Sequence, residues 1–185
     1  MSAHPDDLTA AAQHVRLLLF DVDGVLTDGR ILLHADGTES KQYHIRDGTA
    51  LVLARRSGLL TGLLSARTSA STLERARQLA IPIVRQGASN KLTAYREILA
   101  EHGLTDQDVA FMGDDVQDLL VLTRVGLACA PADAVPEVRA RVRWISAHGG
   151  GAGAVRELIE LVLRAQGRWD ELVGTFLVED LGVPR

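Results

Sequence analysis

A short apolar run that ends in two aspartates constrains the fold more than any other feature. Residues Val15 to Phe20 are apolar except for Arg16, and Asp21 and Asp23 follow directly. Such a run is typical of a strand buried on both faces of a parallel sheet. In open α/β sheets, ligands bind beyond the carboxyl ends of the strands. The pattern therefore predicts a ligand site at Asp21 and Asp23, where Gly24 lets the chain turn beside a bound phosphate.

The spacing of the two aspartates suits phosphoryl transfer. The pleat of an extended chain would return Asp23 to the same side as Asp21, so one carboxylate can attack phosphorus while the other handles a proton. Asp and Gly are also common in simple turns, and that alternative stays open. An EF-hand loop is disfavoured, because Val25 and Leu26 stand where calcium binding needs an acid or amide and then Gly.

A hydroxyl follows the next apolar run, from Leu59 to Leu64. Ser65 stands at the end of that expected strand and can donate a hydrogen bond to a phosphate oxygen. Ser and Thr also cap helices, and Ser69 is suited to cap the helix expected over Ser71 to Leu79. Ser65 precedes that cap, so it remains the better candidate for the ligand site.

A lysine and an acidic cluster complete the pattern. Lys91 lies near the start of a helix expected over Ala88 to His102, where a cation opposes the helix dipole unless an anion lies nearby. The alternative is a solvated surface charge. Farther on, the apolar run Val109 to Met112 leads into Gly113 and three aspartates, which repel one another unless a cation intervenes. Magnesium is the cation that best fits such a set of carboxylates.

The order of these residues is similar to that in the haloacid dehalogenase superfamily of phosphatases. The residues that carry this resemblance are Asp21, Asp23, Ser65, Lys91, Asp114 and Asp118. Four longer segments also resemble the family of 3-deoxy-D-manno-octulosonate 8-phosphate phosphatases. These segments are Asp21 to Gly29, Ile45 to Gly48, Gly113 to Asp118, and Gly150 to Glu157.

The resemblance implies a magnesium-dependent phosphomonoester hydrolase. Asp21 would form an aspartyl-phosphate, and Asp23 would protonate the departing sugar oxygen and then activate water, with Ser65 and Lys91 completing the catalytic group. Mg²⁺ would be held by the Asp21 carboxylate, the Asp23 backbone carbonyl and Asp114.

Supporting roles fall to two further acids. Asp118 would act through water or as a support, and the sequence leaves open whether Asp115 orients Lys91.

The implied substrate is an acidic sugar phosphate, best fitted by 3-deoxy-D-manno-octulosonate 8-phosphate in lipopolysaccharide biosynthesis. Arg67 is the best placed cation for the substrate carboxylate, with Arg46 second and Gly24 beside the phosphate. The chain departs from the family at Ala66, where Gly is usual, and at Ala152, where many members carry Arg.

Those departures leave other substrates and functions open. A nonulosonate 9-phosphate or a related sugar phosphate is the first alternative. A non-catalytic partner module of a sugar nucleotidyltransferase is less favoured, because every catalytic position is retained. A receiver-type signalling domain is disfavoured, since its phosphorylated aspartate lies on a middle strand.

The alternation of apolar runs with helical periodicity predicts an α/β fold, a doubly wound Rossmann-like parallel sheet. A β-hairpin is expected over residues 30–45, with strands Arg30 to His34 and Ser40 to Ile45 around an Asp-Gly turn. It leaves no room for a cap domain. The resemblance implies a homotetramer in which hairpins complete neighbouring sites, and a solvent-exposed flap is the alternative.

Composition agrees with a single domain over residues 1–185. The net charge of −4 argues against a nucleic-acid binder. The single cysteine, Cys129, is expected to be a small buried hydrophobe. The sequence shows no secretion signal and no apolar run long enough to span a bilayer, so we expect a cytoplasmic protein. Residues 1–13 are expected to be flexible, and the tail over 166–185 to form a short amphipathic helix that covers the core.

Overall fold

The protein is built around a six-stranded parallel sheet with strand order β5-β4-β1-β6-β7-β8. The computed structural model describes residues 5–176. The strands of this sheet are β1 (Leu17–Phe20), β4 (Leu60–Leu64), β5 (Ile83–Arg85), β6 (Val109–Met112), β7 (Leu127–Ala130) and β8 (Trp144–Ile145). This architecture confirms the predicted doubly wound α/β fold, because β1 lies at the centre and the chain extends the sheet on both sides of it.

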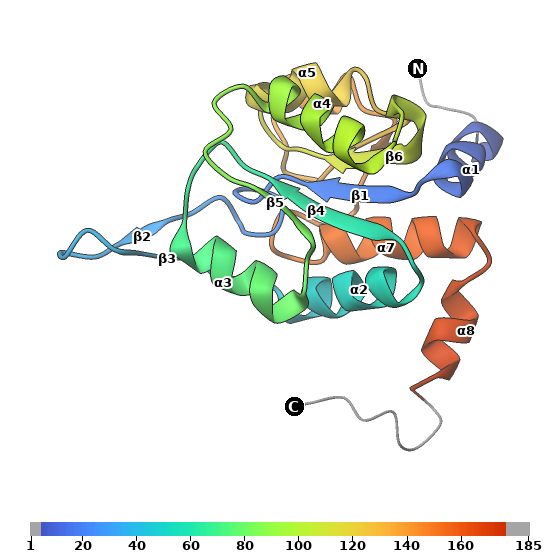
Figure 1. The fold of residues 1–185 in the computed structure, drawn as a ribbon, viewed down its shortest axis with the longest axis horizontal. Helices are drawn as coiled ribbons and strands as arrows, with labels where there is room; N and C mark the ends of the chain where they lie inside the picture. The colour runs from blue at the N-terminus through green and yellow to red at the C-terminus, as the bar shows by residue number, and fades with distance from the viewer. Residues whose placement is uncertain (1–4, 177–185) are drawn as a thin grey trace.

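Helices cover both faces of the sheet (Figure 1). The helices are α1 (Pro5–His14), α2 (Ile45–Arg56), α3 (Ala70–Leu79), α4 (Lys91–His102), α5 (Leu119–Leu122), α6 (Pro136–Arg139), α7 (Ala154–Ala165) and α8 (Trp169–Gly174). In Figure 1, α2, α3 and α7 lie below the sheet, and α4 and α5 lie above it. Leu18 and Phe20 belong to one hydrophobic core, and Leu17 and Leu19 to the other. The pleat of β1 thus feeds both cores, which explains why its sequence is apolar throughout.

The strand register brings the predicted polar residues to one edge of the sheet. Phe20 pairs with Leu63 of β4 and with Met112 of β6. The residues that follow these strands therefore emerge side by side at their carboxyl ends. The edge where Asp21 and Ser65 leave the sheet is the one predicted to bind a ligand.

The hairpin after β1 is present but shorter than predicted. Its strands are β2 (Leu32–Leu33) and β3 (Glu39–Ser40), and the pair projects away from the sheet (Figure 1). The turn between them follows the Asp-Gly signal, because the Asp36 carboxylate accepts a hydrogen bond from the Thr38 amide at 2.9 Å. The strand expected from Ser40 to Ile45 stops at Ser40. Beyond it the chain turns toward the site, and Ile45 already begins α2.

The segment after the acidic cluster is less regular than its sequence indicates. The apolar residues from Val116 to Val125 favour one helix, but the structure has a 3₁₀ turn, η2 (Val116–Asp118), followed by the single turn α5, because Asp115 and Asp118 form a capping box around η2. Within residues 1–13, the described part forms most of α1, which packs on α7 and buries Ala12. The Gln166 amide also donates to the carbonyl of Ala12 at 3.2 Å.

Other boundaries differ by a few residues. The helix predicted from Ala88 begins at Lys91, because the Asn90 side chain caps it by accepting from the Thr93 amide at 3.1 Å. Ser69 is the N-cap residue of α3, although its side chain makes no capping hydrogen bond.

The tail packs on the core, as predicted, over the part that the structure describes. Trp169 in α8 is buried, and Leu172 packs against the same core. Phe176 is exposed, although Arg56 lies 5.8 Å from its ring centroid. The rest of the predicted tail, from Leu177 on, lies outside the described residues.

Cys129 is buried, as predicted, and burial raises the pKa of its thiol. Among the described residues, no helix combines the length and the apolar composition needed to cross a membrane.

The predicted motif from Ile45 to Gly48 has a structural role. Asp47 is buried at the start of α2, and its carboxylate accepts a hydrogen bond from the Arg156 amide at 2.8 Å. Arg156 lies in the first turn of α7, whose first amides have no partner within the helix. Asp47 therefore ties the start of α2 to the start of α7, 109 residues farther along the chain.

Candidate active site

A cavity of about 200 Å³ lies at the carboxyl edge of the sheet. Its lining includes eight of the predicted site residues, and these are Asp21, Asp23, Ser65, Arg67, Lys91, Asp114, Asp115 and Asp118. Gly24 and Arg46 do not line it. The sequence order of these residues thus corresponds to a real cluster in space.

Asp21 is fixed by the sheet. Its backbone amide donates to the carbonyl of Met112 at 3.0 Å, which continues the pairing of β1 with β6 by one residue. The side chain is buried, and its carboxylate lies 2.9 Å from the Lys91 ammonium. Burial, followed by repulsion from Asp118, raises the pKa of Asp21 to about 7 despite that lysine.

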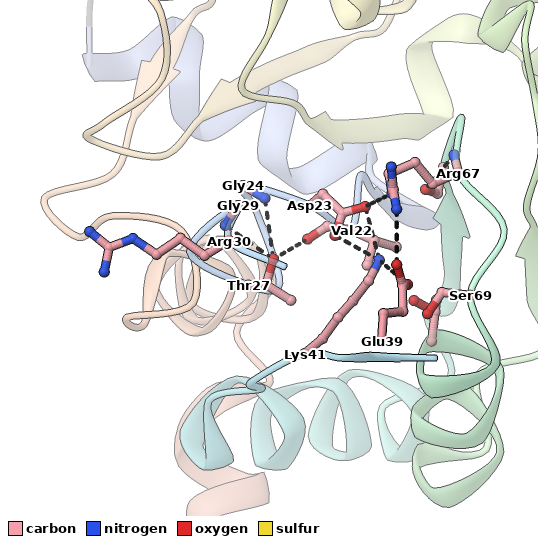
Figure 2. Close-up of polar contacts among 12 residues, drawn as sticks. Val22, Asp23, Gly24, Thr27, Gly29, Arg30, Glu39, Lys41, Arg67 and Ser69 are labelled. Carbon is pink, nitrogen blue, oxygen red and sulfur yellow. Dashed lines mark hydrogen bonds and ion pairs between the residues drawn. The ribbon is translucent and has the colours of Figure 1, made fainter. Parts of the chain in front are cut away.

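Asp23 is placed by a turn and not by the pleat. The chain leaves the sheet after Asp21, and the carbonyl of Val22 accepts hydrogen bonds from the amides of Val25, Leu26 and Thr27. The Thr27 hydroxyl also accepts from the amides of Gly24 and Gly29 (Figure 2). The backbone after Asp21 is therefore not extended, and the expectation that the pleat places Asp23 beside Asp21 is wrong. This turn is what brings Asp23 to the cavity.

Lys91 is a buried cation between two carboxylates. Its ammonium donates to Asp118 at 2.6 Å and lies 2.9 Å from Asp21. Burial alone would lower the pKa of Lys91, but these two carboxylates outweigh it and raise the pKa. The anion that the sequence predicted beside this helix start is thus present as protein carboxylates, which compensate the unfavourable helix dipole.

Asp118 supports the site, as expected, and Asp115 does not orient Lys91. One oxygen of Asp118 binds Lys91, and the other accepts from the amide of Asp114 at 3.1 Å. Asp115 instead accepts a hydrogen bond from the Val116 amide at 2.7 Å. The open question about Lys91 is thereby answered: the capping geometry of η2 turns Asp115 away and leaves Asp118 to hold the lysine.

Gly24 makes room for Asp114. A Cβ atom at Gly24 would lie 2.0 Å from Oδ2 of Asp114, and the backbone φ of Gly24 is +88°. Both facts require glycine at this position. The place of Gly24 beside the phosphate stays a prediction.

The donor set fits a hard divalent cation. Carboxylate oxygens of Asp21, Asp114 and Asp118 lie within 4.8 Å of one another. Oδ1 of Asp114 is buried without a hydrogen-bond partner. Burial, then repulsion from Asp21 and Asp118, raises the pKa of Asp114 to about 8. Mg²⁺ prefers a few carboxylates with water and phosphate oxygens. Both oxygens of Asp118 are engaged, one by Lys91 and one by the Asp114 amide, and Lys91 also lies against one oxygen of Asp21. Asp114 and the other oxygen of Asp21 therefore remain as carboxylate ligands.

We expect Mg²⁺ to stabilise the protein more at about pH 8 than at about pH 5. The raised pKa values of Asp21 and Asp114 mean that the folded protein keeps these protons at pH values where the unfolded chain has lost them. Without metal, stability therefore falls as the pH rises from about 4 toward 8. Mg²⁺ binds the ionised carboxylates and offsets that loss. Thermal melting with Mg²⁺ or with a chelator across this range measures the effect.

Asp114→Asn is the matched variant for this measurement, because it removes one charge and one ligand. We expect it to lose most of the Mg²⁺-dependent shift. A melting temperature that does not respond to Mg²⁺ at any pH would contradict the assigned metal site.

Ser65 and Arg67 lie on the other side of the cavity. Ser65 is buried directly after β4, and its hydroxyl accepts from the amide of Arg67 at 3.2 Å. The Arg67 guanidinium is half-exposed and donates to Glu39 of the hairpin at 2.9 Å. Together, the Ser69 hydroxyl and Arg67 hold the pKa of Glu39 below its usual range. Arg67 is therefore a half-exposed cation that lines the cavity and is paired with Glu39, which a substrate carboxylate would replace.

Arg46 is not brought to this cavity. It is exposed in the first turn of α2, because the opposite side of that turn buries Asp47 and Gly48. Arg46 instead lines a second cavity of about 180 Å³, which also includes Ala152 and shares no lining residue with the first. The predicted contact of Arg46 with substrate is therefore not at this cavity within one subunit, and it stays a prediction.

Lys41 is the residue that the sequence reasoning missed. Its side chain is 0% exposed, and its ammonium lies 2.7 Å from Oδ1 of Asp23 and donates to Oδ2 at 2.9 Å (Figure 2). Glu39 lies 3.7 Å from the same ammonium. The available signal was a lysine two residues after a glutamate, placed just after the expected Asp-Gly turn.

A larger cavity, of about 570 Å³, lies near the amino ends of β1 and β4. Its lining includes Arg16, Leu60 and Gln166 but no carboxylate. The acidic cluster and the buried lysines are at the other edge, so the smaller cavity is the one equipped for phosphoryl chemistry.

Comparison with known proteins agrees with this geometry. Residues 59–158 match the family described as haloacid dehalogenase-like hydrolase. The 3-deoxy-D-manno-octulosonate 8-phosphate phosphatase of Escherichia coli K12 is 39% identical over 168 residues, which are 91% of this chain and 89% of that protein.

Two solved structures are similar over most of their length. A probable phosphatase of the yrbi family from Pseudomonas syringae is 39% identical with a TM-score of 0.92, covering 95% of this chain and 99% of that one. The 3-deoxy-D-manno-octulosonate 8-phosphate phosphatase of Moraxella catarrhalis, solved with magnesium ion, phosphate ion and KDO, is 35% identical with a TM-score of 0.91. That match covers 94% of this chain and 99% of the other.

Proposed function

We propose that this protein hydrolyses 3-deoxy-D-manno-octulosonate 8-phosphate, an acidic sugar phosphate. The chain belongs to the haloacid dehalogenase-like hydrolases and, within them, to the 3-deoxy-D-manno-octulosonate 8-phosphate phosphatase family. The observation that carries the proposal is the cluster of Asp21, Asp114 and Lys91 around one cavity. Mg²⁺, when bound by Asp21, Asp114 and the backbone carbonyl of Asp23, supplies positive charge against the phosphate oxygens.

The protein's own residues then divide the chemistry. An oxygen of Asp21 attacks phosphorus and forms an aspartyl-phosphate, while Asp23 gives a proton to the departing sugar oxygen. Asp23 next takes a proton from the water that hydrolyses this intermediate. Lys91 neutralises charge beside Asp21, and the Ser65 hydroxyl donates to a phosphate oxygen.

Arg67 supports the choice of an acidic substrate. A guanidinium pairs with a carboxylate through two hydrogen bonds, and Arg67 is the half-exposed cation at this cavity. A substrate carboxylate that binds Arg67 takes the place of Glu39. Ala152 does not line this cavity, so its departure from the family pattern does not argue against the octulosonate within one subunit.

A panel of sugar phosphates tests the substrate. We expect 3-deoxy-D-manno-octulosonate 8-phosphate to have the highest kcat/KM with Mg²⁺, ahead of a nonulosonate 9-phosphate and far ahead of glucose 6-phosphate. Arg67→Ala should lower kcat/KM for the acidic substrates by about 10- to 100-fold, since a hydrogen bond between charged groups contributes about 1.5–3 kcal/mol.

The control is Arg30→Ala, which removes an exposed guanidinium that pairs with Asp28. It should leave kcat/KM unchanged for both the acidic and the neutral sugar phosphates. A preference for the neutral hexose phosphate, or an equal effect of Arg67→Ala on all substrates, would overturn the assignment. If the nonulosonate 9-phosphate has the highest kcat/KM, it becomes the assigned substrate in place of the octulosonate, and the proposed reaction mechanism stays the same.

We further propose a homotetramer with one catalytic domain in each subunit. Leu32 and Leu33 on the hairpin are 63% and 71% exposed, and an isolated two-stranded hairpin is marginally stable without a packing partner. A neighbouring subunit is the partner that the family resemblance implies. Light scattering tests this: the native protein should have four times the mass of the chain, and Leu32→Ser with Leu33→Ser should reduce it. The cytoplasmic location stays a prediction.

A further inference from the structure

We propose that Lys41 is a positioning residue that fixes the carboxylate of Asp23 for proton transfer, a role that rests on the proposed phosphatase function. Its ammonium contacts both oxygens of Asp23, at 2.7 and 2.9 Å (Figure 2). Asp23 is itself only 18% exposed. This pair is the principal contact that joins the hairpin to the predicted acid and base of the reaction.

The burial of Lys41 favours a specific role over a chance ion pair. A fully enclosed ammonium is costly unless it is paired, and exposed lysine pairs contribute little. Lys41 has a 0% exposed side chain, and the carboxylates of Asp23 and Glu39 lie around it. Arg67 contacts the same two acids, with its Nε 3.7 Å from Asp23 and its Nη2 2.9 Å from Glu39. Positive and negative groups therefore alternate around Asp23.

The turn that carries Asp23 explains why a positioning residue is needed. The hydrogen bonds of that turn run through the backbone of Val22 and the hydroxyl of Thr27, and the Asp23 side chain takes no part in them. Lys41 and Arg67 are the groups that contact this carboxylate among the described residues. Proton transfer needs the carboxylate within hydrogen-bond reach, and a misplacement of about 1 Å can cost about 100-fold in rate.

The two steps of the reaction separate this role from simple phosphate binding. In the first, a bond forms between Asp21 and phosphorus, the bond from phosphorus to the sugar oxygen breaks, and the proton of Asp23 passes to that oxygen. In the second, the oxygen of water bonds to phosphorus, the bond to Asp21 breaks, and a proton of water returns to Asp23. A sugar alkoxide leaves only with a proton, whereas p-nitrophenolate leaves readily without one.

Lys41→Met tests the proposal through the first turnover of two substrates, measured by rapid quench with Mg²⁺. Release of sugar from the octulosonate phosphate should slow by about 100-fold. The first-turnover release of p-nitrophenol from p-nitrophenyl phosphate should slow by less than about 5-fold, followed by a slow steady state because the second step still needs Asp23. KM should change much less than kcat.

Arg30→Met is the matched control, because it also removes a cation from the segment over residues 30–45. The Arg30 side chain pairs with Asp28 and points away from Asp23 (Figure 2). This variant should leave both rates as in the native protein. Glu39→Gln is the second variant, since it loosens Lys41 without removing it, and it should give a smaller change of the same pattern.

Three results would overturn the role of Lys41: equal slowing of both substrates, no slowing of either, or a change in KM alone. If Lys41→Met is unfolded, it will lose the p-nitrophenol burst as well. In that case Glu39→Gln tests the role of Lys41, through the ratio of its first-turnover rates of sugar release and p-nitrophenol release. If the native protein releases no sugar from any acidic sugar phosphate, the proposed function fails and the role of Lys41 fails with it. If the native protein releases sugar and Lys41→Met releases it at the same rate, only the role of Lys41 fails.

Discussion

Asp21→Asn is expected to reduce kcat for the sugar phosphate by at least about 10⁴-fold, the scale seen when a nucleophile is removed from an enzyme. An amide oxygen at this position lacks the charge needed to attack phosphorus, and it is a weaker metal ligand than the carboxylate that it replaces. Lys91 keeps its partner Asp118, and the β1 pairing through the backbone amide is unchanged. The fold should therefore survive, so that steady-state turnover reports on chemistry.

Asp28→Asn provides the control, since Asp28 belongs to the same motif but is exposed and lies outside the cavity. Its activity should match that of the native protein. Undiminished turnover of Asp21→Asn, with a melting curve like that of the native protein, would exclude Asp21 as the nucleophile.

Lys91→Met is expected to have the second largest effect, on stability and activity together. Lys91 and Asp118 are both buried, at 4% and 0% exposure of their side chains, so removing the lysine leaves uncompensated carboxylates inside the protein. Breaking such a pair costs about 3–5 kcal/mol. Turnover should fall by about 10²–10³-fold, because a positioned charge at the transferring group is lost. Urea unfolding and steady-state kinetics measure the two effects.

A double variant separates stability from chemistry. Adding Asp118→Asn to Lys91→Met removes one of the stranded charges, while the amide oxygen can still accept from the backbone of Asp114. Stability should recover in large part and activity should not. A recovery of both would mean that Lys91 acts only as a structural partner of Asp118, and its assignment as a catalytic group would be wrong.

The sequence was sufficient for the fold because the strands are short apolar runs that end in polar residues. β6 was predicted over Val109 to Met112, the bounds that the structure has, and β1 was predicted two residues too long. In each case the strand is buried on both faces, so the hydrophobic pattern is continuous and its end is sharp. The parallel register then aligned Asp21 with Ser65 and the cluster after Met112.

The parts that could not be predicted depend on contacts between distant segments. Lys41 acquires its place only because the hairpin ends beside the turn that holds Asp23, and no local pattern describes that meeting. Arg46 lies away from the cavity for a related reason, since it falls in the first turn of α2 and its side chain is exposed. Asp115 and Asp118 are equally acidic in sequence, and only the capping geometry of η2 distinguishes them.

The most direct test of this mechanism is to find the phosphoryl group on the protein during turnover. The native protein with Mg²⁺ and sugar phosphate labelled at phosphorus should be quenched in acid within the first turnover, and its peptides mapped by mass spectrometry. We expect the phosphoryl group on the peptide that contains Asp21, and on the carboxylate of that residue. Sugar release at the native rate with no labelled peptide, or with the label on a different residue, would contradict covalent catalysis by Asp21.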